Sequence, residues 1–126
     1  MPEKMSQSLE DYLEAIYRLS LSIEVRVTDI AADLSLSKPS VNRAVNALKE
    51  QGYVEHEYYG KITLTETGTE KGKEVYKRHL LLKSFLMTQL GVDRETAETD
   101  ACRMEHVMSE TTVKHLIDYI KRIKEA

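Results

Sequence analysis

The strongest constraint on the fold is a pair of short helical patterns that a strand-like hairpin follows directly. Residues 27–34 carry apolar residues at helical spacing, and a second helix is expected to begin after Ser37 and to run to about Gln51. Ser37 is a favourable N-cap residue, and Pro39 in the first helical turn removes no intrahelical hydrogen bond. The sequence therefore predicts a helix, a tight turn and a second helix.

The segment after Gly52 has the two-residue period of β-strands. Residues 53–58 alternate, a turn is expected at residues 59–61, and Ile62-Thr63-Leu64 forms the returning strand. Elsewhere the periodicity is helical, with helices expected over about 7–22, 65–90, 93–108 and 109–124. The predicted fold is mainly α with a small β-wing, in which the half that contains the hairpin joins a second helical half near residues 65–70.

The distribution of charge supports two different functional faces. The 126 residues carry a net charge of −3, but residues 61–83 carry +3 and residues 84–110 carry −4. One face can therefore attract an anion and another a cation. The length suits one compact domain or two small ones, and neither a membrane span nor a secretory signal is apparent. We expect a cytoplasmic protein without a membrane partner.

The helix after Ser37 has the polar face that a DNA-recognition helix needs. Asparagine pairs with adenine, arginine with guanine, and proline contacts thymine methyl groups, whereas serine and lysine near a helix N-terminus engage phosphates. The same face is also consistent with an ordinary solvated helix surface. The candidate DNA-binding residues are Ser37, Lys38, Pro39, Ser40, Asn42, Arg43 and Asn46, with Arg26 and Lys61 as weaker candidates for backbone contact.

A second pattern predicts a metal site. Cys102, Glu105 and His106 lie at positions i, i+3 and i+4 of one expected helix, so their side chains project from one face. Sulfur, nitrogen and oxygen together suit a divalent first-row transition metal, and suit calcium or magnesium poorly. The pattern is equally consistent with Cys102 as a core residue and with Glu105 and His106 as a solvated pair.

Three further residues are candidate partners for this site. Asp11 and Glu14 lie three residues apart on the first helix, away from its apolar face. His79 lies within the apolar arc of residues 65–90, in phase with Val75 and Leu90, where an imidazole without a partner is costly. Each also has a simpler interpretation: Asp11 in a capping box, Glu14 as a surface acid, and His79 bonded to a carbonyl.

These residues belong to a series of motifs that resembles a known family over nearly the whole chain. The series resembles the diphtheria-toxin-repressor family of metal-dependent transcriptional repressors, which includes the manganese transport regulators. The motifs that carry the resemblance are Glu10-Asp11-Tyr12-Leu13-Glu14-Ala15-Ile16-Tyr17, Val27-Thr28-Asp29-Ile30-Ala31, Ser37-Lys38-Pro39-Ser40-Val41, Leu64-Thr65-Glu66-Thr67-Gly68, Arg78-His79, and Ala101-Cys102-Arg103-Met104-Glu105-His106-Val107-Met108-Ser109.

The resemblance implies a homodimeric repressor of metal-uptake genes that binds operator DNA when Fe2+ or Mn2+ is bound. It implies a winged helix-turn-helix DNA-binding domain over residues 1–66 and an α-helical metal-binding and dimerisation domain over residues 67–126. Helix 1 would contribute metal ligands to the second domain. No enzymatic activity and no small organic substrate are implied.

The resemblance also implies a ligand set that combines two branches of the family. Cys102, Glu105 and His106 match the primary site of the iron-sensing branch; Asp11, Glu14 and His79 match, with Glu105 and His106, the two-metal cluster of the manganese branch. One or two divalent ions per subunit are therefore expected. The thiol favours Fe2+ slightly, and Co2+, Ni2+ or Zn2+ are expected to act as surrogates. The ancillary site of the iron branch is not expected, because Lys83 and Glu98 replace its acid and its histidine.

Two rival classes are weighed against this interpretation. The first is a winged-helix repressor that responds to a small organic ligand or to oxidation of Cys102. The second is a metallohydrolase, which needs an open coordination position beside a substrate cleft and a general base. No G-x-S-x-G nucleophile motif is present, and the candidate ligands all come from helices. Catalysis is therefore not expected.

Overall fold

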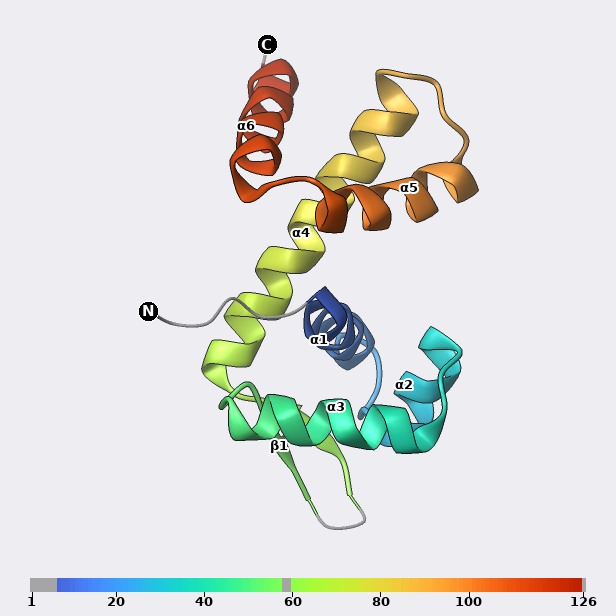
Figure 1. The fold of residues 1–126 in the computed structure, drawn as a ribbon, viewed down its shortest axis with the longest axis vertical. Helices are drawn as coiled ribbons and strands as arrows, with labels where there is room; N and C mark the ends of the chain where they lie inside the picture. The colour runs from blue at the N-terminus through green and yellow to red at the C-terminus, as the bar shows by residue number, and fades with distance from the viewer. Residues whose placement is uncertain (1–6, 58–59, 126) are drawn as a thin grey trace. The chain divides into compact units, whose positions relative to one another are not determined.

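The computed structural model describes residues 7–57 and 60–125, and this part of the chain is mainly helical with one two-stranded sheet (Figure 1). The order of elements confirms the predicted fold class. Residue 58, the last of the predicted first strand, and residue 59, the first of the predicted turn, lie outside the described residues. The elements are α1 (Gln7–Ser20), α2 (Val27–Leu34), α3 (Lys38–Glu50), β1 (Val54–His56), β2 (Ile62–Leu64), α4 (Glu66–Thr88), α5 (Arg94–Val107) and α6 (Glu110–Glu125).

The chain divides into two compact units, residues 1–76 and residues 77–126, and the division falls within α4. Each unit has its own apolar core. The domain boundary expected between residues 66 and 67 stays a prediction. No described helix is both long enough and apolar enough to cross a membrane.

The core of the first unit forms between α1, α2, α3 and the hairpin. The apolar stripes predicted for α1 and α3 are buried, and the hairpin contributes Val54 and Ile62 to the same core. Burying such a cluster is the main favourable term in the folding of a unit this small. Its innermost side chains are Leu13, Ile16, Val25, Ile30, Val41, Val45 and Leu48.

Local hydrogen bonds set the turn between α2 and α3. Ser35 adopts a left-handed conformation with φ of 56°, and the Leu36 N–H donates to the Ala31 carbonyl at 3.0 Å, as in a Schellman motif. Ser37 then caps α3 by accepting from the Ser40 N–H, and Pro39 lies in the first turn. The predicted cap and turn are confirmed.

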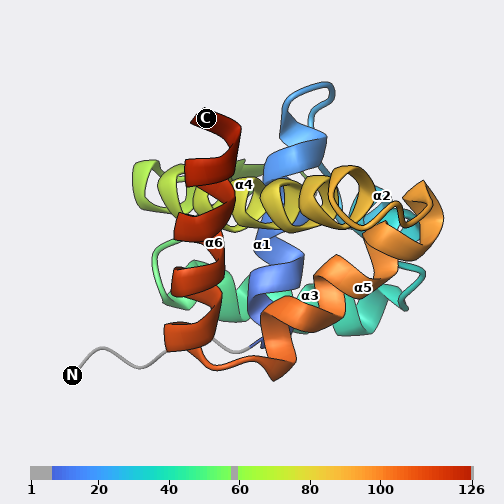
Figure 2. The same ribbon diagram turned by 90° about the horizontal axis from the view of Figure 1, so that it is seen from above.

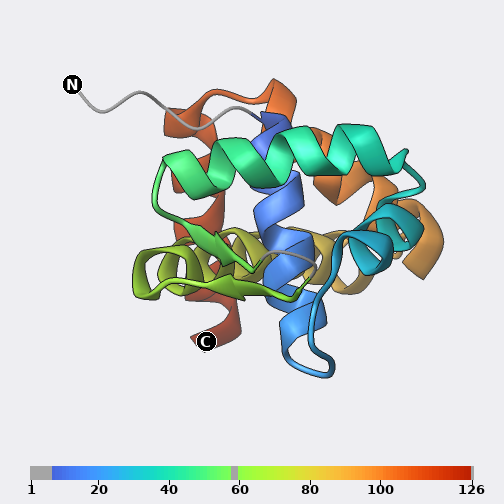
Figure 3. The same cartoon turned by 90° about the horizontal axis from the view of Figure 1, so that it is seen from below.

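The hairpin lies beside α3 and closes one side of the first unit (Figure 3). Its strands are antiparallel, with Val54 opposite Leu64 and His56 opposite Ile62. An isolated bridge joins Val25 to Ile62, so the chain between α1 and α2 pairs with β2. This third pairing supports the hairpin at the ladder pair nearest its turn, since an isolated two-stranded hairpin is only marginally stable.

The second unit is built from the C-terminal part of α4 with α5 and α6 (Figure 2). Leu82 and Leu86 of α4, Ala97 and Ala101 of α5, and Ile120 of α6 form its buried core.

Two helix ends differ from the predictions. α1 ends at Ser20 rather than at residue 22. At this end the Ser20 hydroxyl donates to the Tyr17 carbonyl. α4 ends at Thr88 rather than near residue 90, and Leu90, which was expected on its apolar side, is 61% exposed. Gly91 has φ of 69°, and the Val92 N–H donates back to the Leu86 carbonyl, so the chain leaves the helix early.

Candidate metal centre and DNA-binding surface

The α5 helix carries three of the predicted metal ligands, Cys102, Glu105 and His106. The helix begins at Asp93, whose side chain accepts a hydrogen bond from the Thr96 N–H at 3.0 Å. Ala97, Ala101 and Glu105 follow one another at intervals of four residues on its buried face, so the Glu105 carboxylate is carried into the interior and is only 1% exposed. Cys102 and His106 are half-buried.

The predicted position of His79 within the apolar arc of α4 is confirmed. Val75 and Leu82 are fully buried on either side of it, and the imidazole is 5% exposed. His79 Nδ1 lies 3.7 Å from Glu105 Oε2. Within the second unit the structure therefore brings together His79 of α4 and the ligand-bearing face of α5.

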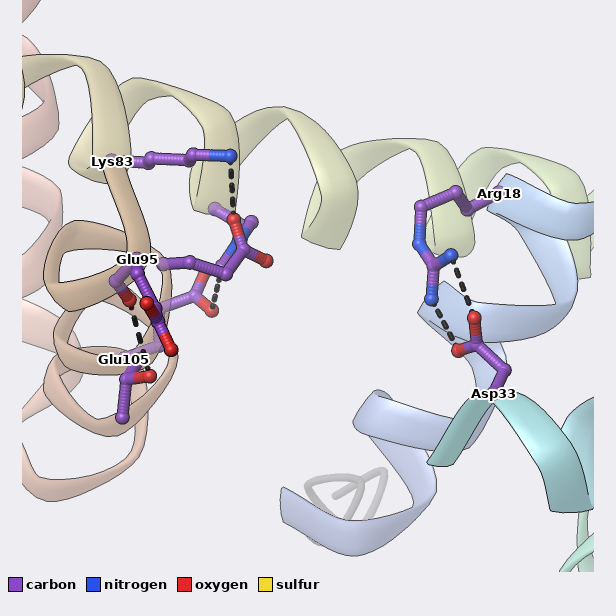
Figure 4. A network of polar contacts seen from close by, with 8 residues as sticks. Arg18, Asp33, Lys83, Glu95 and Glu105 are labelled. Atoms are coloured by element: carbon purple, nitrogen blue, oxygen red, sulfur yellow. Dashed lines mark hydrogen bonds and ion pairs between the residues drawn. The ribbon is translucent and has the colours of Figure 1, made fainter. Parts of the chain in front are cut away.

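Two cations and one carboxylate that the sequence analysis did not assign to this site surround the pair. Arg78 Nε donates to Glu105 Oε1 at 3.1 Å, and His79 Nε2 lies 2.8 Å from Glu98 Oε1. Lys83 Nζ lies 2.7 Å from Glu98 Oε2, and Figure 4 shows this lysine extended from α4. The spacing in the sequence could have indicated Lys83 and Glu98. Lys83 follows His79 by four residues and Glu98 precedes Cys102 by four, so each shares a helical face with a candidate ligand.

Glu98 is held in its ionised form. Partial burial acts to raise the pKa of this carboxyl, but the hydrogen bond from Lys83 and the nearby charges of His79 and Lys83 outweigh it, and the net pKa is lowered. An ionised carboxylate only accepts hydrogen bonds. The groups that contact Glu98 must therefore be the donors.

Asp11 and Glu14 lie on α1, in the first unit. Both are half-buried, and they project away from Leu13 and Ile16, which face the core as predicted. One turn further on, Arg18 pairs with Asp33 of α2 through two hydrogen bonds, of 3.0 and 2.5 Å (Figure 4). This pair raises the pKa of the Arg18 guanidinium, mainly through the Asp33 hydrogen bond, and ties α1 to α2.

The predicted recognition face of α3 is exposed. Asn42, Arg43 and Asn46 lie on the side opposite the buried Val41, Val45 and Leu48, so the expected division of the helix into two faces is confirmed. Arg43 Nη2 donates to the Ser40 hydroxyl at 3.2 Å.

The other DNA-binding candidates occupy the start of α3 and the neighbouring loops. Ser37, Lys38 and Pro39 are exposed and Ser40 is half-buried. Arg26 is exposed at the start of α2, where its backbone N–H donates to Asp29. Lys61 is half-buried directly before β2, at the turn end of the hairpin, and its ammonium lies 4.0 Å from Glu24 Oε1. Glu24 therefore partly neutralises the charge of Lys61.

Sequence comparison places these two regions in known domain families. Residues 4–62 match the iron-dependent repressor N-terminal DNA-binding domain, and residues 65–126 match the iron-dependent repressor metal-binding and dimerisation domain. The chain belongs to the iron-dependent repressor family. This family consists of metal-dependent transcriptional repressors, so the predicted family is confirmed.

Relatives within the iron-dependent repressor family match most of the chain. An HTH-type transcriptional regulator of Methanocaldococcus jannaschii is 37% identical over 123 residues, which are 96% of this chain and 98% of the relative. The transcriptional regulator MntR of Bacillus subtilis strain 168 is 36% identical over 122 residues, covering 94% of this chain and 83% of MntR.

Solved structures of the family share the fold. The manganese regulator SloR superimposes with a TM-score of 0.75 at 28% identity, over 94% of this chain. That match covers 55% of the SloR chain, so the present chain spans about half the length of this solved relative.

The donors of the second unit fit the metal dependence of the family. A thiol, a buried carboxylate and two imidazoles are ligands that divalent first-row transition metals accept, whereas calcium and magnesium prefer oxygen alone. In the buried part of this unit, His79 Nδ1 and Glu105 Oε2, two different donor types, lie 3.7 Å apart. The chemistry of these side chains is therefore consistent with a transition-metal site.

Proposed function

We propose that this protein represses genes for metal uptake by binding operator DNA as a homodimer when it is loaded with Mn2+ or Fe2+. The observation that carries the proposal is the closeness of His79 Nδ1 to Glu105 Oε2, 3.7 Å apart, on the helix that also bears Cys102 and His106, in a chain whose α3 exposes a polar face. As a repressor of chromosomal genes it would act in the cytoplasm. Loading with one or two ions per subunit is consistent with the ligand set.

We assign DNA recognition to the exposed face of α3. In this assignment Asn42, Arg43 and Asn46 face base edges in the major groove, and Lys38 with Ser40 contacts phosphates at the helix N-terminus. The wing, with Lys61, and Arg26 would contact the backbone. Phosphate contacts supply affinity and register, whereas base contacts supply specificity.

We assign metal binding to six side chains, namely Asp11, Glu14, His79, Cys102, Glu105 and His106. A bound divalent cation would supply positive charge that offsets the repulsion among the acids and the thiolate. The thiol favours Fe2+ over Mn2+, since Mn2+ prefers oxygen and nitrogen donors. Co2+, Ni2+ and Zn2+ would bind as surrogates, because intrinsic affinity follows the Irving–Williams order.

The assignment of Asp11 and Glu14 provides the proposed link between metal and DNA. In the first unit α1 packs on α3 through Leu13, Ile16, Val41 and Val45, so fixing α1 also fixes the recognition helix. Ligands contributed by both units would hold α3 in one orientation relative to the dimer axis. Two recognition helices could then reach successive major grooves, about 34–36 Å apart on B-DNA.

A binding assay with and without metal tests the proposal. Selection from a random duplex library in the presence of Mn2+ would yield a preferred duplex, whose affinity is then measured by fluorescence anisotropy with Mn2+ and with a chelator. Metal should tighten binding roughly 5–150-fold, the usual range of allosteric coupling. Equal affinity under both conditions would refute metal-dependent repression.

Asn46→Ala should weaken binding to the selected duplex about tenfold and relax specificity at one base pair. Lys38→Ala should instead weaken binding to all duplexes equally and reduce the slope of log affinity against log salt by about 1. Anisotropy with single-base variants of the duplex, repeated over a salt series, measures both effects. An unchanged ranking of the base variants in Asn46→Ala would contradict the assignment of this side chain to a base edge.

Cys102→Ser should change metal selectivity. Replacing sulfur by oxygen should weaken Zn2+ and Co2+ binding by roughly tenfold and Mn2+ binding by less, because the softer ions prefer thiolate. Competition with a chromophoric chelator measures the three affinities.

The same variant separates metal sensing from the rival thiol-oxidation mechanism. Under that mechanism, peroxide would change DNA binding of the wild-type protein in the presence of a chelator, and Cys102→Ser would abolish the response. Under metal sensing, chelated protein shows no response to peroxide in either form. A parallel titration with organic ligands is not needed, because metal alone should suffice for activation.

A further inference from the structure

His79 lies between two carboxylates of α5 and contacts each with a different ring nitrogen. Nε2 is 2.8 Å from Glu98 Oε1, and Nδ1 is 3.7 Å from Glu105 Oε2. Because a carboxylate only accepts hydrogen bonds, the shorter contact requires Nε2 to carry the proton. A histidine binds a metal through a deprotonated ring nitrogen, and with the proton on Nε2 that nitrogen is Nδ1, on the side of Glu105.

We propose that Glu98 and Lys83 are positioning residues that fix the tautomer and orientation of His79, so that Nδ1 is the nitrogen that binds the metal. This inference rests on the proposed function and names the atom through which His79 would bind the metal ion. Neither Glu98 nor Lys83 is itself a ligand in this arrangement. Carboxylates that accept the distal N–H of a histidine commonly orient metal ligands in this way.

The contact with Lys83 is what allows the exposed carboxylate of Glu98 to orient the buried ring of His79. The Glu98 side chain is 52% exposed and would exchange between many conformations if only water contacted it. Lys83 Nζ engages its second oxygen at 2.7 Å while the first oxygen accepts from His79. Both oxygens are thereby committed to cationic or N–H donors, which favours a positioning role for Glu98 over direct ligation.

The Glu105 side of the ring has a matching arrangement. Arg78 Nε donates to Glu105 Oε1, and Oε2 is the oxygen that faces His79 Nδ1. Two ligand atoms bound to one ion at about 2.1 Å lie roughly 3–3.5 Å apart. The separation of 3.7 Å between Nδ1 and Oε2 is therefore close to what a shared ion requires.

NMR of protein labelled with 15N-histidine tests which nitrogen binds, with Zn2+ alone as a diamagnetic probe. We expect Nε2 of His79 to keep its proton in the Zn2+-loaded protein and Nδ1 to show the shift that marks coordination. Coordination through Nε2, or no shift at either nitrogen of His79 while His106 shifts, would overturn this inference and leave the proposed function standing. Absence of Zn2+ binding at every histidine would refute the proposed function, and this inference with it.

Variants test the roles of the two positioning residues. Glu98→Ala should weaken Zn2+ binding about 10–100-fold, and ring spectra of the metal-free variant should show a mixture of tautomers. Lys83→Met should shift both measurements in the same direction by less, and Lys83→Arg should restore them because arginine also donates to the carboxylate. Wild-type affinity in Glu98→Ala would overturn the inference.

Matched controls use residues of the same type on the same helices. Asp100→Ala on α5 and Lys77→Met on α4 alter exposed side chains and should leave Zn2+ affinity and the His79 spectrum unchanged. Thermal unfolding in chelator reports any general destabilisation, which would not by itself change the tautomer. If Glu98→Ala fails to fold, the comparison of Lys83→Met with Lys83→Arg decides, and equal behaviour of these two variants would overturn the inference.

Discussion

Glu105→Gln is expected to abolish the metal-stimulated component of operator binding while leaving the fold intact. Glutamine retains the size of glutamate, and its carbonyl oxygen still accepts a hydrogen bond from Arg78, which donates to Glu105 Oε1 at 3.1 Å in the wild-type protein. The amide loses the negative charge and is a poorer donor to a divalent cation. The expected stimulation of roughly 5–150-fold should therefore fall to none.

Anisotropy with the selected duplex, in Mn2+ and in chelator, measures this loss. Glu95→Gln is the matched control, because it makes the same substitution at an exposed position of α5 and should keep full stimulation. Binding in chelator should be equal for both variants and the wild-type protein. His106→Ala should reproduce the Glu105→Gln result, and unchanged metal dependence in both variants would refute the site assignment.

The burial of His79 shows what the spacing of residues along one helix can predict and what it cannot. Its phase with Val75 predicted an imidazole inside an apolar arc, and the structure confirms that His79 is buried. Such a position demands a polar partner. The partners, Glu98 and Glu105, lie on another helix, and periodicity within one helix carries no information on how two helices cross.

Lys83 and Glu98 illustrate a different limit. The family resemblance identifies them only as departures from an ancillary metal site, with a cation and an acid where an acid and a histidine would be needed. The structure shows that the two departures are complementary, since the ammonium and carboxylate lie 2.7 Å apart. Lys83 or Glu98 alone accounts only for the loss of one ligand of the ancillary site. Together the two residues form an ion pair.

At Leu90 the helical pattern gave a wrong prediction, because α4 ends at Thr88 and Leu90 is exposed. Its spacing from Leu82 and Leu86 continues the apolar stripe, but the backbone turns at Gly91 and the Val92 N–H bonds to the Leu86 carbonyl. A pattern that ends beside glycine therefore leaves the last turn of a helix undetermined.

Gly68→Ala is expected to destabilise the first unit, because Gly68 packs directly on the backbone of Tyr53. A Cβ at residue 68 would overlap the Tyr53 carbonyl oxygen, which also accepts a hydrogen bond from the Thr65 N–H at 3.0 Å. Thr65 in turn caps α4 by accepting from the Gly68 N–H at 3.0 Å and donates to the Gly52 carbonyl. The start of α4 and the chain entering β1 are thus joined through backbone atoms.

Relief of this overlap requires the backbone itself to move, since no flexible side chain stands in the way. Overpacking combined with a lost hydrogen bond should cost on the order of 3 kcal/mol. Hydrogen exchange at the Thr65 and Gly68 amides measures the local loss, and Glu70→Ala, an exposed substitution one half-turn further along α4, is the control. Wild-type protection in Gly68→Ala would show that α4 can shift without strain. Because Val54 of β1 belongs to the same core as Val41 and Val45 of α3, a displaced β1 should also loosen α3, and if α3 reads the operator as proposed, DNA binding should weaken even with metal present.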